Sequence, residues 1–305
     1  MTVRLTVDRA RWWNHVTYVA DTVDNLVPVV KGNGYGFGRQ VLAAEASKLS
    51  PIIAVGNVHE LAGLAEQVTA VVLTPTLTAP ESTAPVLTIG SAAHIDALRG
   101  WDGRVIVKLA SSMRRYGGGI ELVAAAQRAG LRTVGVSIHP PLAGDDQAHR
   151  TDIVRHLPQI DPSLDVWVSH VAPTTYETLP TSHRYKLRLG TYLWHGDREA
   201  FVLEADVLDT RPVQAGEQAG YRLTTVPGDG TLVMVGAGSA NGVTSLADGR
   251  SPFHFERSRL DLLEPPHMHT SMVFVPAGDP CPTTGDWVDL QRPLTMTTAD
   301  ELRWT

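Results

Sequence analysis

Short apolar runs rich in β-branched residues recur through the first two thirds of the chain, with helix-length segments between them, and this repetition leaves few folds open. The eight runs are residues 26–30, 52–56, 70–74, 86–90, 104–109, 133–138, 165–170 and 186–190. Eight buried strands with helical connections favour a closed parallel barrel over an open sheet. We therefore predict an α/β fold, a (β/α)8 TIM barrel, in residues 1–196.

The sequence changes character after Gly196, where extended runs such as FVLEADVL and TLVMVGAG are punctuated by Gly and Pro. This pattern is typical of a β domain, and we predict a separate C-terminal one over residues 197–305. The N-terminal run RLTV fits a strand of either domain.

Composition excludes several classes of partner. The 26 Lys and Arg residues against 32 Asp and Glu, with no basic cluster, give no electrostatic reason to expect nucleic acid or an anionic membrane. No apolar stretch approaches the roughly 18–20 residues that cross a bilayer. The single cysteine, Cys281, cannot form an internal disulfide, and the N-terminus lacks a signal-peptide pattern, so we expect a cytoplasmic protein.

Several polar residues fall at or near the carboxyl ends of the predicted strands, the face on which such barrels carry their chemistry: Lys31, Lys108, His139, His170 and Arg188. The strongest signal is PVVKGNGYGFG, residues 28–38. Its glycines let a backbone approach a ligand closely, and a lysine at a barrel mouth can lose its proton through desolvation, as imine chemistry requires. The alternative reading is a surface lysine before a Gly-rich turn.

This segment resembles the cofactor-lysine motif of alanine racemases and of related single-barrel proteins of pyridoxal 5′-phosphate (PLP) homeostasis, in which tyrosine follows the lysine by four residues. The resemblance implies that Lys31 carries PLP as an imine and that Tyr35 contacts its phosphate. The segment VIVKLASSMRRYG resembles the next racemase motif, which implies that Arg115 contacts the cofactor's phenolic oxygen or the substrate carboxylate. In many racemases the counterpart of Lys108 is carbamylated and braces this arginine. A solvated loop arginine and a packed strand-end lysine are the structural alternatives.

Three further segments match in the same order. The segment VSIHPPLAGDD resembles the racemase strand whose histidine packs against the pyridine ring, which implies that role for His139. The segment WVSHVAPTT resembles the strand and turn that supply a phosphate-binding hydroxyl, which implies that role for Thr174. A lone histidine at a strand end is, however, more often structural. KLRLGTYLWHG resembles the last barrel strand, which implies that Arg188 faces the pyridine nitrogen while the amides of Gly190 and Thr191 hold the phosphate. A fixed positive charge keeps that nitrogen unprotonated and weakens the electron sink, which suits racemisation better than transamination.

The resemblance weakens in the β domain. Two-base racemisation needs a proton acceptor on each face of the substrate, and racemases supply the second from a tyrosine loop where this chain has GSANG, with Ser239 at the tyrosine position. The segment HMHTSMVFV lies where racemases have a segment that helps to close the site. We therefore take Ser239 and His269 as candidate catalytic residues. His267 and Met268 are candidate substrate contacts. His267 is a further candidate base, and both histidines could equally be turn residues.

The resemblance as a whole implies a PLP-dependent isomerase of D-amino acid metabolism, which interconverts L- and D-amino acids by abstracting the α-proton from an imine on Lys31. It also implies a homodimer with shared active sites. A PLP decarboxylase, lyase or aldolase and a non-catalytic PLP carrier are the alternatives. The pair His267 and His269 lacks a visible third ligand, so we predict no metal site.

Overall fold

The computed structural model describes residues 2–305, which form two compact units. One unit consists of residues 13–34 and 39–196 and is called the barrel unit below. The other consists of residues 2–12, 35–38 and 197–305 and is called the β unit.

The barrel unit is built on one parallel sheet, which within the described chain has eight strands in the order β2-β9-β8-β7-β6-β5-β4-β3. The strands are β2 (Leu26–Pro28), β3 (Ile52–Val55), β4 (Thr69–Val72), β5 (Val86–Ile89), β6 (Arg104–Lys108), β7 (Arg132–Ser137), β8 (Asp165–Ser169) and β9 (Tyr185–Leu189). Val29, directly after β2, forms a parallel bridge with Ala54 of β3. Because β2 and β3 are the two ends of this strand order, the bridge closes the barrel. Each strand overlaps one of the eight predicted runs, and the predicted TIM barrel with a C-terminal β domain is confirmed.

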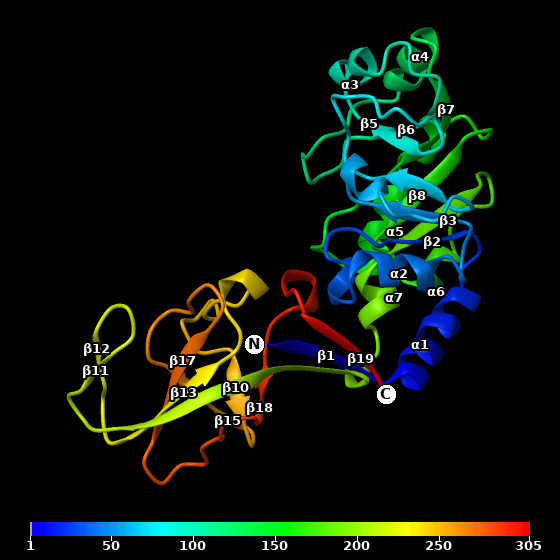
Figure 1. Cartoon of the computed structure of the whole chain (residues 1–305). Coiled ribbons are helices and arrows are strands. Elements are labelled where there is room, and N and C mark those ends of the chain that lie inside the picture. The colour runs from blue at the N-terminus through cyan, green and yellow to red at the C-terminus, as the bar shows by residue number, and fades with distance from the viewer. Residues whose placement is uncertain (1) are drawn as a thin grey trace. The chain divides into compact units, whose positions relative to one another are not determined.

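The helical layer is thinner than the spacing of the strands suggested (Figure 1). The helices are α1 (Arg9–Asp21), α2 (Arg39–Ala46), α3 (Ala92–Ala97), α4 (Glu121–Arg128), α5 (Asp146–Val154), α6 (Pro173–Tyr176) and α7 (Thr191–His195). The β3–β4 connection has only the 3-10 turn η2 (Val58–Leu61), and residues 73–85 before β5 form no helix. Pro75, Pro80 and Pro85 explain this, because proline cannot donate the backbone hydrogen bond and it disfavours helix in the preceding residue.

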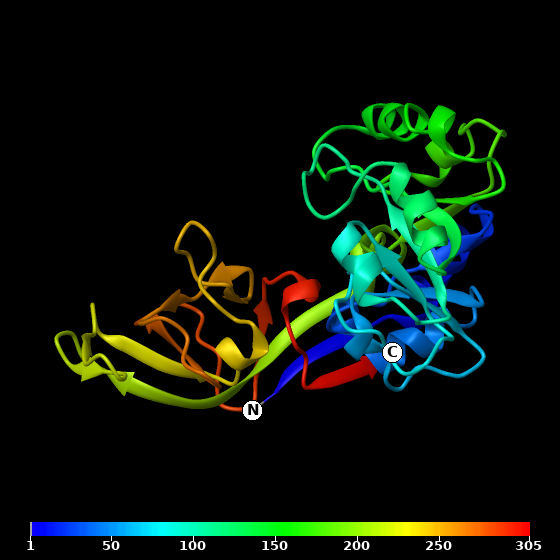
Figure 2. The ribbon, with the colours of Figure 1, turned by 90° about the horizontal axis from the view of Figure 1, so that it is seen from above.

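The β unit is organised around the long strand β10 (Phe201–Val213), which Figure 2 shows extending along the whole sheet. Its sheet runs β15-β14-β18-β10-β13-β17-β16, and β1 pairs antiparallel with β10 and parallel with β19. The N-terminal run RLTV therefore joins this sheet. The strands are β1 (Val3–Val7), β13 (Gly230–Val235), β14 (Phe253–Phe255), β15 (Ser258–Arg259), β16 (Asp261–Leu262), β17 (Ser271–Pro276), β18 (Trp287–Leu290) and β19 (Glu301–Trp304), and β11 (Gln218–Ala219) and β12 (Thr224–Thr225) form a separate hairpin.

Alternation of apolar residues gives the β unit its core. Val233, Val273 and Val288 are fully buried and come from β13, β17 and β18, together with Phe253 from β14. Successive side chains of a strand point to opposite faces, so these residues share one face of the sheet, and a smaller buried cluster of Val226, Leu232 and Phe274 packs on the other. Among the residues described, no helix is both long and apolar enough to cross a bilayer.

Candidate active site

The barrel gathers its chemically distinctive residues at the carboxyl ends of the strands. Lys31 follows β2, Lys108 ends β6, His139 lies just after β7, His170 just after β8, and Arg188 is near the end of β9. Parallel strands bring these ends to one face. The residues predicted from five separate sequence segments are therefore brought together in space.

Lys31 begins a loop that positive backbone angles fold tightly back on itself. Gly34 has φ +64° and its amide donates to the Lys31 carbonyl at 3.2 Å. A Cβ on Gly34 would lie 2.5 Å from the amide nitrogen of Arg39, so only glycine fits. The Lys31 side chain is open to solvent on one side, and the barrel partly desolvates its amine. This desolvation, with repulsion from Arg115 and Arg188, lowers the pKa of Lys31.

Glu60 is a site residue that the sequence did not single out. It lies in η2 after β3, is buried, and accepts hydrogen bonds from the amides of Gly56 at 2.7 Å and Gly32 at 3.2 Å. Its charge acts on the Lys31 amine and raises that pKa, in opposition to the larger effect of burial. Glu60 thus fixes the backbone next to Lys31 from a neighbouring strand end.

Lys108 is a buried cation without a counter-charge. It is 4% exposed, and its Nζ has no hydrogen-bond partner within residues 2–305. Burial, followed by repulsion from Arg188 and Arg115, lowers its pKa to about 8. Its amine lies 5.6 Å from the centre of the Tyr116 ring, whose hydroxyl accepts a hydrogen bond from Arg115 at 2.5 Å. Tyr116 therefore stands between Lys108 and Arg115, where the predicted brace would be.

Arg188 is a buried arginine whose partners are neutral. Its guanidinium donates to the carbonyls of Ile138 at 3.1 Å, Trp167 at 3.3 Å and Val168 at 3.4 Å, and to the hydroxyl of Ser169 at 3.5 Å. Burial lowers its pKa to about 10, which still leaves it charged at neutral pH. The barrel wall thus holds a fixed positive charge at this face.

His139 is held neutral by its surroundings. Burial, then repulsion from Arg188, His170 and the two site lysines, lowers its pKa to about 2. Its Nδ1 forms a short hydrogen bond with the Ser169 hydroxyl. The Arg188 guanidinium donates to the same hydroxyl at 3.5 Å, which favours the arrangement in which the hydroxyl donates to Nδ1 and the neutral His139 ring carries its proton on Nε2. Ser169, the buried last residue of β8, has no sequence signature that singles it out.

His170 has a structural contribution that a sequence pattern does not reveal. Its backbone is left-handed, with φ 61°, and its Nδ1–H donates to the Pro140 carbonyl at 2.9 Å. Its ring lies 4.4 Å from that of His139, and burial lowers its pKa. It ties the loop after β7 to the end of β8.

The predicted phosphate contacts fall in three places. Thr174 is exposed in α6, directly after β8, and Gly190 and Thr191 form the start of α7, directly after β9. The first amides of a helix have no partner within it, so they can meet an anion. Tyr35 has a left-handed backbone, groups with the β unit and is 6% exposed, and burial raises its pKa to about 12.

The remaining candidates lie in the β unit. Ser239 begins the 3-10 turn η5 (Ser239–Asn241), and its amide donates to the His267 carbonyl at 2.8 Å. The next amide, Ala240, donates to the Met268 carbonyl at 2.8 Å, so the two predicted segments form one local structure. Met268 and His269 are exposed, whereas the His267 side chain is hydrogen-bonded through Nε2 to the buried Glu264 carboxylate.

The barrel-face residues fit PLP as a ligand. The orphaned Lys108 amine and the mutually repelling charges of Lys31, Arg115 and Arg188 require anions, and Glu60 is the carboxylate that acts on Lys31. PLP supplies an anionic phosphate and phenolic oxygen, and an amino-acid substrate supplies a carboxylate.

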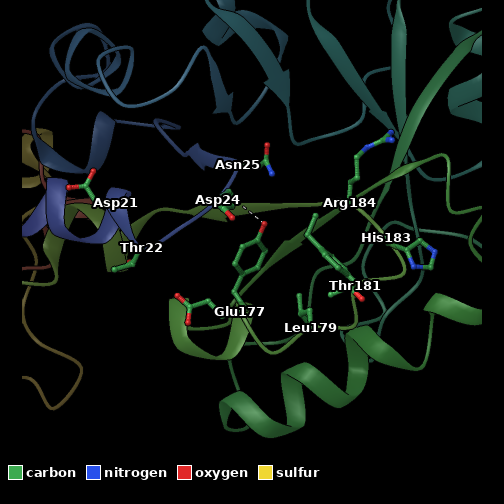
Figure 3. Close-up of a pocket in the computed structure, with 11 residues that line it drawn as sticks. Asp21, Thr22, Asp24, Asn25, Glu177, Leu179, Thr181, His183 and Arg184 are labelled. Carbon is green, nitrogen blue, oxygen red and sulfur yellow. Dashed lines mark hydrogen bonds between the residues drawn. The ribbon is translucent and has the colours of Figure 1, made fainter.

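A separate cavity of about 510 Å³ opens at the other end of the barrel, where Asp24 and Asn25 precede β2 and Arg184 precedes β9 (Figure 3). Several of its polar groups are engaged within the fold. Arg184 pairs with Asp165 at 2.9 Å, His183 contacts the Ile160 carbonyl at 3.1 Å, and the Tyr176 hydroxyl donates to the Asp24 carbonyl at 2.8 Å. We therefore assign the chemistry to the strand-end face rather than to this cavity.

Comparison with known proteins agrees with this geometry. The sequence model described as alanine racemase, N-terminal domain, matches residues 7–196. Solved structures with the same fold include alanine racemase from Bartonella henselae with covalently bound pyridoxal phosphate, at 18% identity and TM-score 0.72, with 100% of both chains covered. Another is alanine racemase from D-cycloserine producing Streptomyces lavendulae, at 19% identity and TM-score 0.73, covering 100% of this chain and 97% of that one. No curated protein matches the chain. The family match spans more than half of the sequence, and the chain belongs to the alanine racemase family.

Proposed function

We propose that this protein is a PLP-dependent amino-acid racemase in which Lys31 carries the cofactor and exchanges the α-proton on one face of the substrate. The observation that carries the proposal is the group of cations at the barrel mouth, in which Arg115 and Arg188 lower the pKa values of Lys31 and Lys108 and the buried Lys108 amine has no hydrogen-bond partner among residues 2–305. Such a group is costly unless it binds an anionic ligand.

Lys31 suits the role of proton carrier. PLP, when bound, supplies an electron sink that makes the α-proton of an amino acid removable. A lowered pKa leaves a larger fraction of the Lys31 amine unprotonated at neutral pH, both to attach the cofactor and to accept a proton. Glu60 fixes the Gly32 backbone, so the amine is presented from a rigid strand end.

The other barrel residues divide the remaining work. Arg188 keeps a positive charge beside the place proposed for the pyridine nitrogen, which favours brief proton abstraction over longer electron storage. His139, neutral and protonated on Nε2, can pack on the ring without adding charge. Arg115 is the proposed partner of the substrate carboxylate, and Thr174, Gly190, Thr191 and Tyr35 the proposed phosphate contacts.

We further propose a cytoplasmic homodimer that acts in D-amino acid metabolism, with each active site completed by the β unit of a second copy. Symmetric pairing is the commonest oligomeric arrangement of soluble proteins. Light scattering is expected to give the mass of a dimer at working concentration, and a monomer would contradict this part of the proposal.

The first test concerns the cofactor. Purified protein mixed with PLP is expected to develop a visible imine band, which borohydride reduction fixes to the peptide that contains Lys31. Lys31→Ala should lose the band. Lys48→Ala, which removes an exposed lysine paired with Glu45, should keep it. A band that survives in Lys31→Ala would refute the assignment of the cofactor lysine.

The second test concerns the reaction. Standard amino acids of both enantiomers are incubated with the PLP-loaded protein in D2O, and chiral chromatography with proton NMR follows inversion and α-hydrogen exchange. Inversion of one amino acid supports a racemase. Release of CO2 or of an aldehyde would indicate the decarboxylase or aldolase alternative, and an imine on Lys31 with no exchange would indicate a PLP carrier.

A further inference from the structure

A buried histidine of α5 contacts a backbone carbonyl with each of its two ring nitrogens. His149 is 7% exposed, its Nδ1 lies 2.5 Å from the His170 carbonyl oxygen, and its Nε2 lies 3.1 Å from the Ala143 carbonyl oxygen. Gly144, with φ +105°, lets the chain pass close to the ring, since a Cβ there would lie 3.4 Å from Nε2. A carbonyl oxygen only accepts, and a neutral imidazole carries one N–H. Both bonds are therefore made only by the doubly protonated, positively charged ring.

The charged side chains of α5 are engaged elsewhere. Each of them has a partner other than His149: Asp145 caps the amide of Ala148 at 2.8 Å, Asp146 accepts from the Thr175 hydroxyl at 2.8 Å, Arg150 donates to the Thr178 hydroxyl at 3.0 Å, and Asp152 pairs with Arg155 at 2.7 Å. No carboxylate forms an ion pair with His149 among residues 2–305. The two carbonyl oxygens are therefore the groups bonded to the charged ring.

The elements packed against His149 present titratable groups that are neutral near pH 7. The His170 ring lies 6.4 Å from the His149 ring, and burial lowers the pKa of His170. Burial also lowers the pKa of His139 to about 2, and it raises the pKa of Tyr176 in α6. An imidazole gains or loses its charge between about pH 5 and 8. A change in the charge of this cluster near neutral pH is therefore expected at His149.

The bonds of His149 tie together two connections at the carboxyl ends of the strands. Ala143 lies in the loop of residues 140–144, which follows β7, and His170 directly follows β8. The backbone of His170 is left-handed, with φ 61°, which is uncommon for any residue except glycine. The bond to its carbonyl helps to hold this conformation, in which the His170 ring lies 4.4 Å from that of His139.

We propose that His149 is a positioning residue whose positive charge assembles this part of the barrel mouth. With both protons, the ring clamps loop 140–144 and His170 in place, and so holds His139 where it is. After the loss of one proton, one of the two carbonyls has no donor, and a buried carbonyl without a donor is costly, so the loop opens to water. The mouth is thus assembled at lower pH and loosened as the pH rises. The consequence for PLP rests on the proposed function, in which His139 packs on the cofactor ring.

The first test follows the proton directly. Imidazole 15N NMR of the full-length protein without added PLP, recorded between about pH 5 and 8, should show His149 change from two protonated ring nitrogens to one. The backbone amides of Leu142, Ala143 and Gly144 should shift with the same midpoint. A His149 ring that is neutral throughout, or loop amides that do not follow its titration, would overturn the inference.

The second test measures how often the loop opens. Opening that releases one proton becomes up to about tenfold more favourable per pH unit. Hydrogen exchange of the three loop amides, corrected for the intrinsic rate, should therefore lose protection as the pH rises. His149→Gln should exchange quickly at every pH. The matched control is His183→Gln, which removes a ring bonded to the Ile160 carbonyl at 3.1 Å, and it should keep the wild-type dependence.

Protection in the wild type that does not change with pH would contradict the clamp. This measurement uses no variant, so it decides the question even where His149→Gln does not fold.

The third test measures the consequence for the site through the dissociation constant of PLP. Imine formation needs an unprotonated Lys31 in both proteins, so the ratio of the constants of His149→Gln and the wild type removes that contribution. The ratio should be about tenfold near the acid end of the range, the usual effect of one unsatisfied buried carbonyl, and should approach one as the wild type loses its proton. A ratio that is constant with pH would overturn the positioning role. If neither protein binds PLP, the proposed function fails, while NMR and hydrogen exchange still decide the clamp.

Discussion

Replacing Lys108 by methionine should make the cofactor-free protein more stable at neutral pH. The folded state lowers the Lys108 pKa from 10.5 to about 8, a difference of about 2.5 pH units. At about 1.36 kcal/mol per unit, this corresponds to a penalty of about 3 kcal/mol for the charged amine, and water at the open mouth reduces it to about 2 kcal/mol. Methionine fills a similar volume without charge, so Lys108→Met should raise the free energy of unfolding by about 2 kcal/mol at pH 7.

The pH dependence identifies the cause. Below about pH 8 Lys108 is protonated in both folded and unfolded chains, so the full penalty applies. Between pH 8 and 10.5 the unfolded chain retains the proton more strongly than the folded one, and wild-type stability therefore rises toward that of the variant. Above pH 10.5 the difference should vanish.

Urea unfolding in CO2-free buffer at several pH values measures this. Lys48→Met provides the control, since that lysine is 52% exposed and its loss should change stability by less than about 0.5 kcal/mol. A Lys108→Met variant that is less stable than the wild type at pH 7, or equally more stable at every pH, would refute the electrostatic account.

Three other predictions follow from the same face of the barrel. In bicarbonate buffer, the unprotonated fraction of Lys108 should take up CO2, and intact-protein mass spectrometry under mild conditions should detect one added CO2 in the wild type and none in Lys108→Met. Gly34→Ala should abolish the imine band with PLP because of its clash with the backbone, whereas Gly32→Ala, which has a similar φ of +66° but nothing within 4 Å of the new Cβ, should keep most of it. Ser169→Ala should allow His139 to populate both neutral tautomers, which 15N NMR would detect, and an unchanged Nε2–H tautomer would contradict the hydroxyl relay.

The barrel was predictable because its signal is repeated and local. Each strand carries its own run of buried β-branched residues, and the site residues of the barrel directly follow such runs or end them, so the order of the segments defines the face on which they meet. Even there the helices were overestimated, since residues 73–85 have the length of a helix but the prolines of a loop.

The residues that sequence reasoning missed act through contacts between distant segments. Glu60 bonds to Gly32, 28 residues away in the chain, and Ser169 connects His139 with Arg188 across three strands. A buried serine or glutamate has no periodic signature, because its role depends on which strand end lies beside it. Glu264 is different, since it lies three residues before His267, but that spacing becomes meaningful only when the chain folds the carboxylate onto the imidazole.

The chemistry of the site follows from the same charge crowding that reduces its stability. Arg188 is bonded to carbonyls and a hydroxyl rather than to a carboxylate, so its field is left to act on Lys31, Lys108 and His139, and it contributes to the lowered pKa of each. A carboxylate beside Arg188 would stabilise the fold but cancel this field. In the function proposed above, the mouth would therefore offer a lysine amine to carry a proton, a neutral histidine to pack on a ring, and a positive charge to disfavour a protonated pyridine. These are the conditions under which proton exchange at Cα is quick and reversible, and deeper electron withdrawal is suppressed.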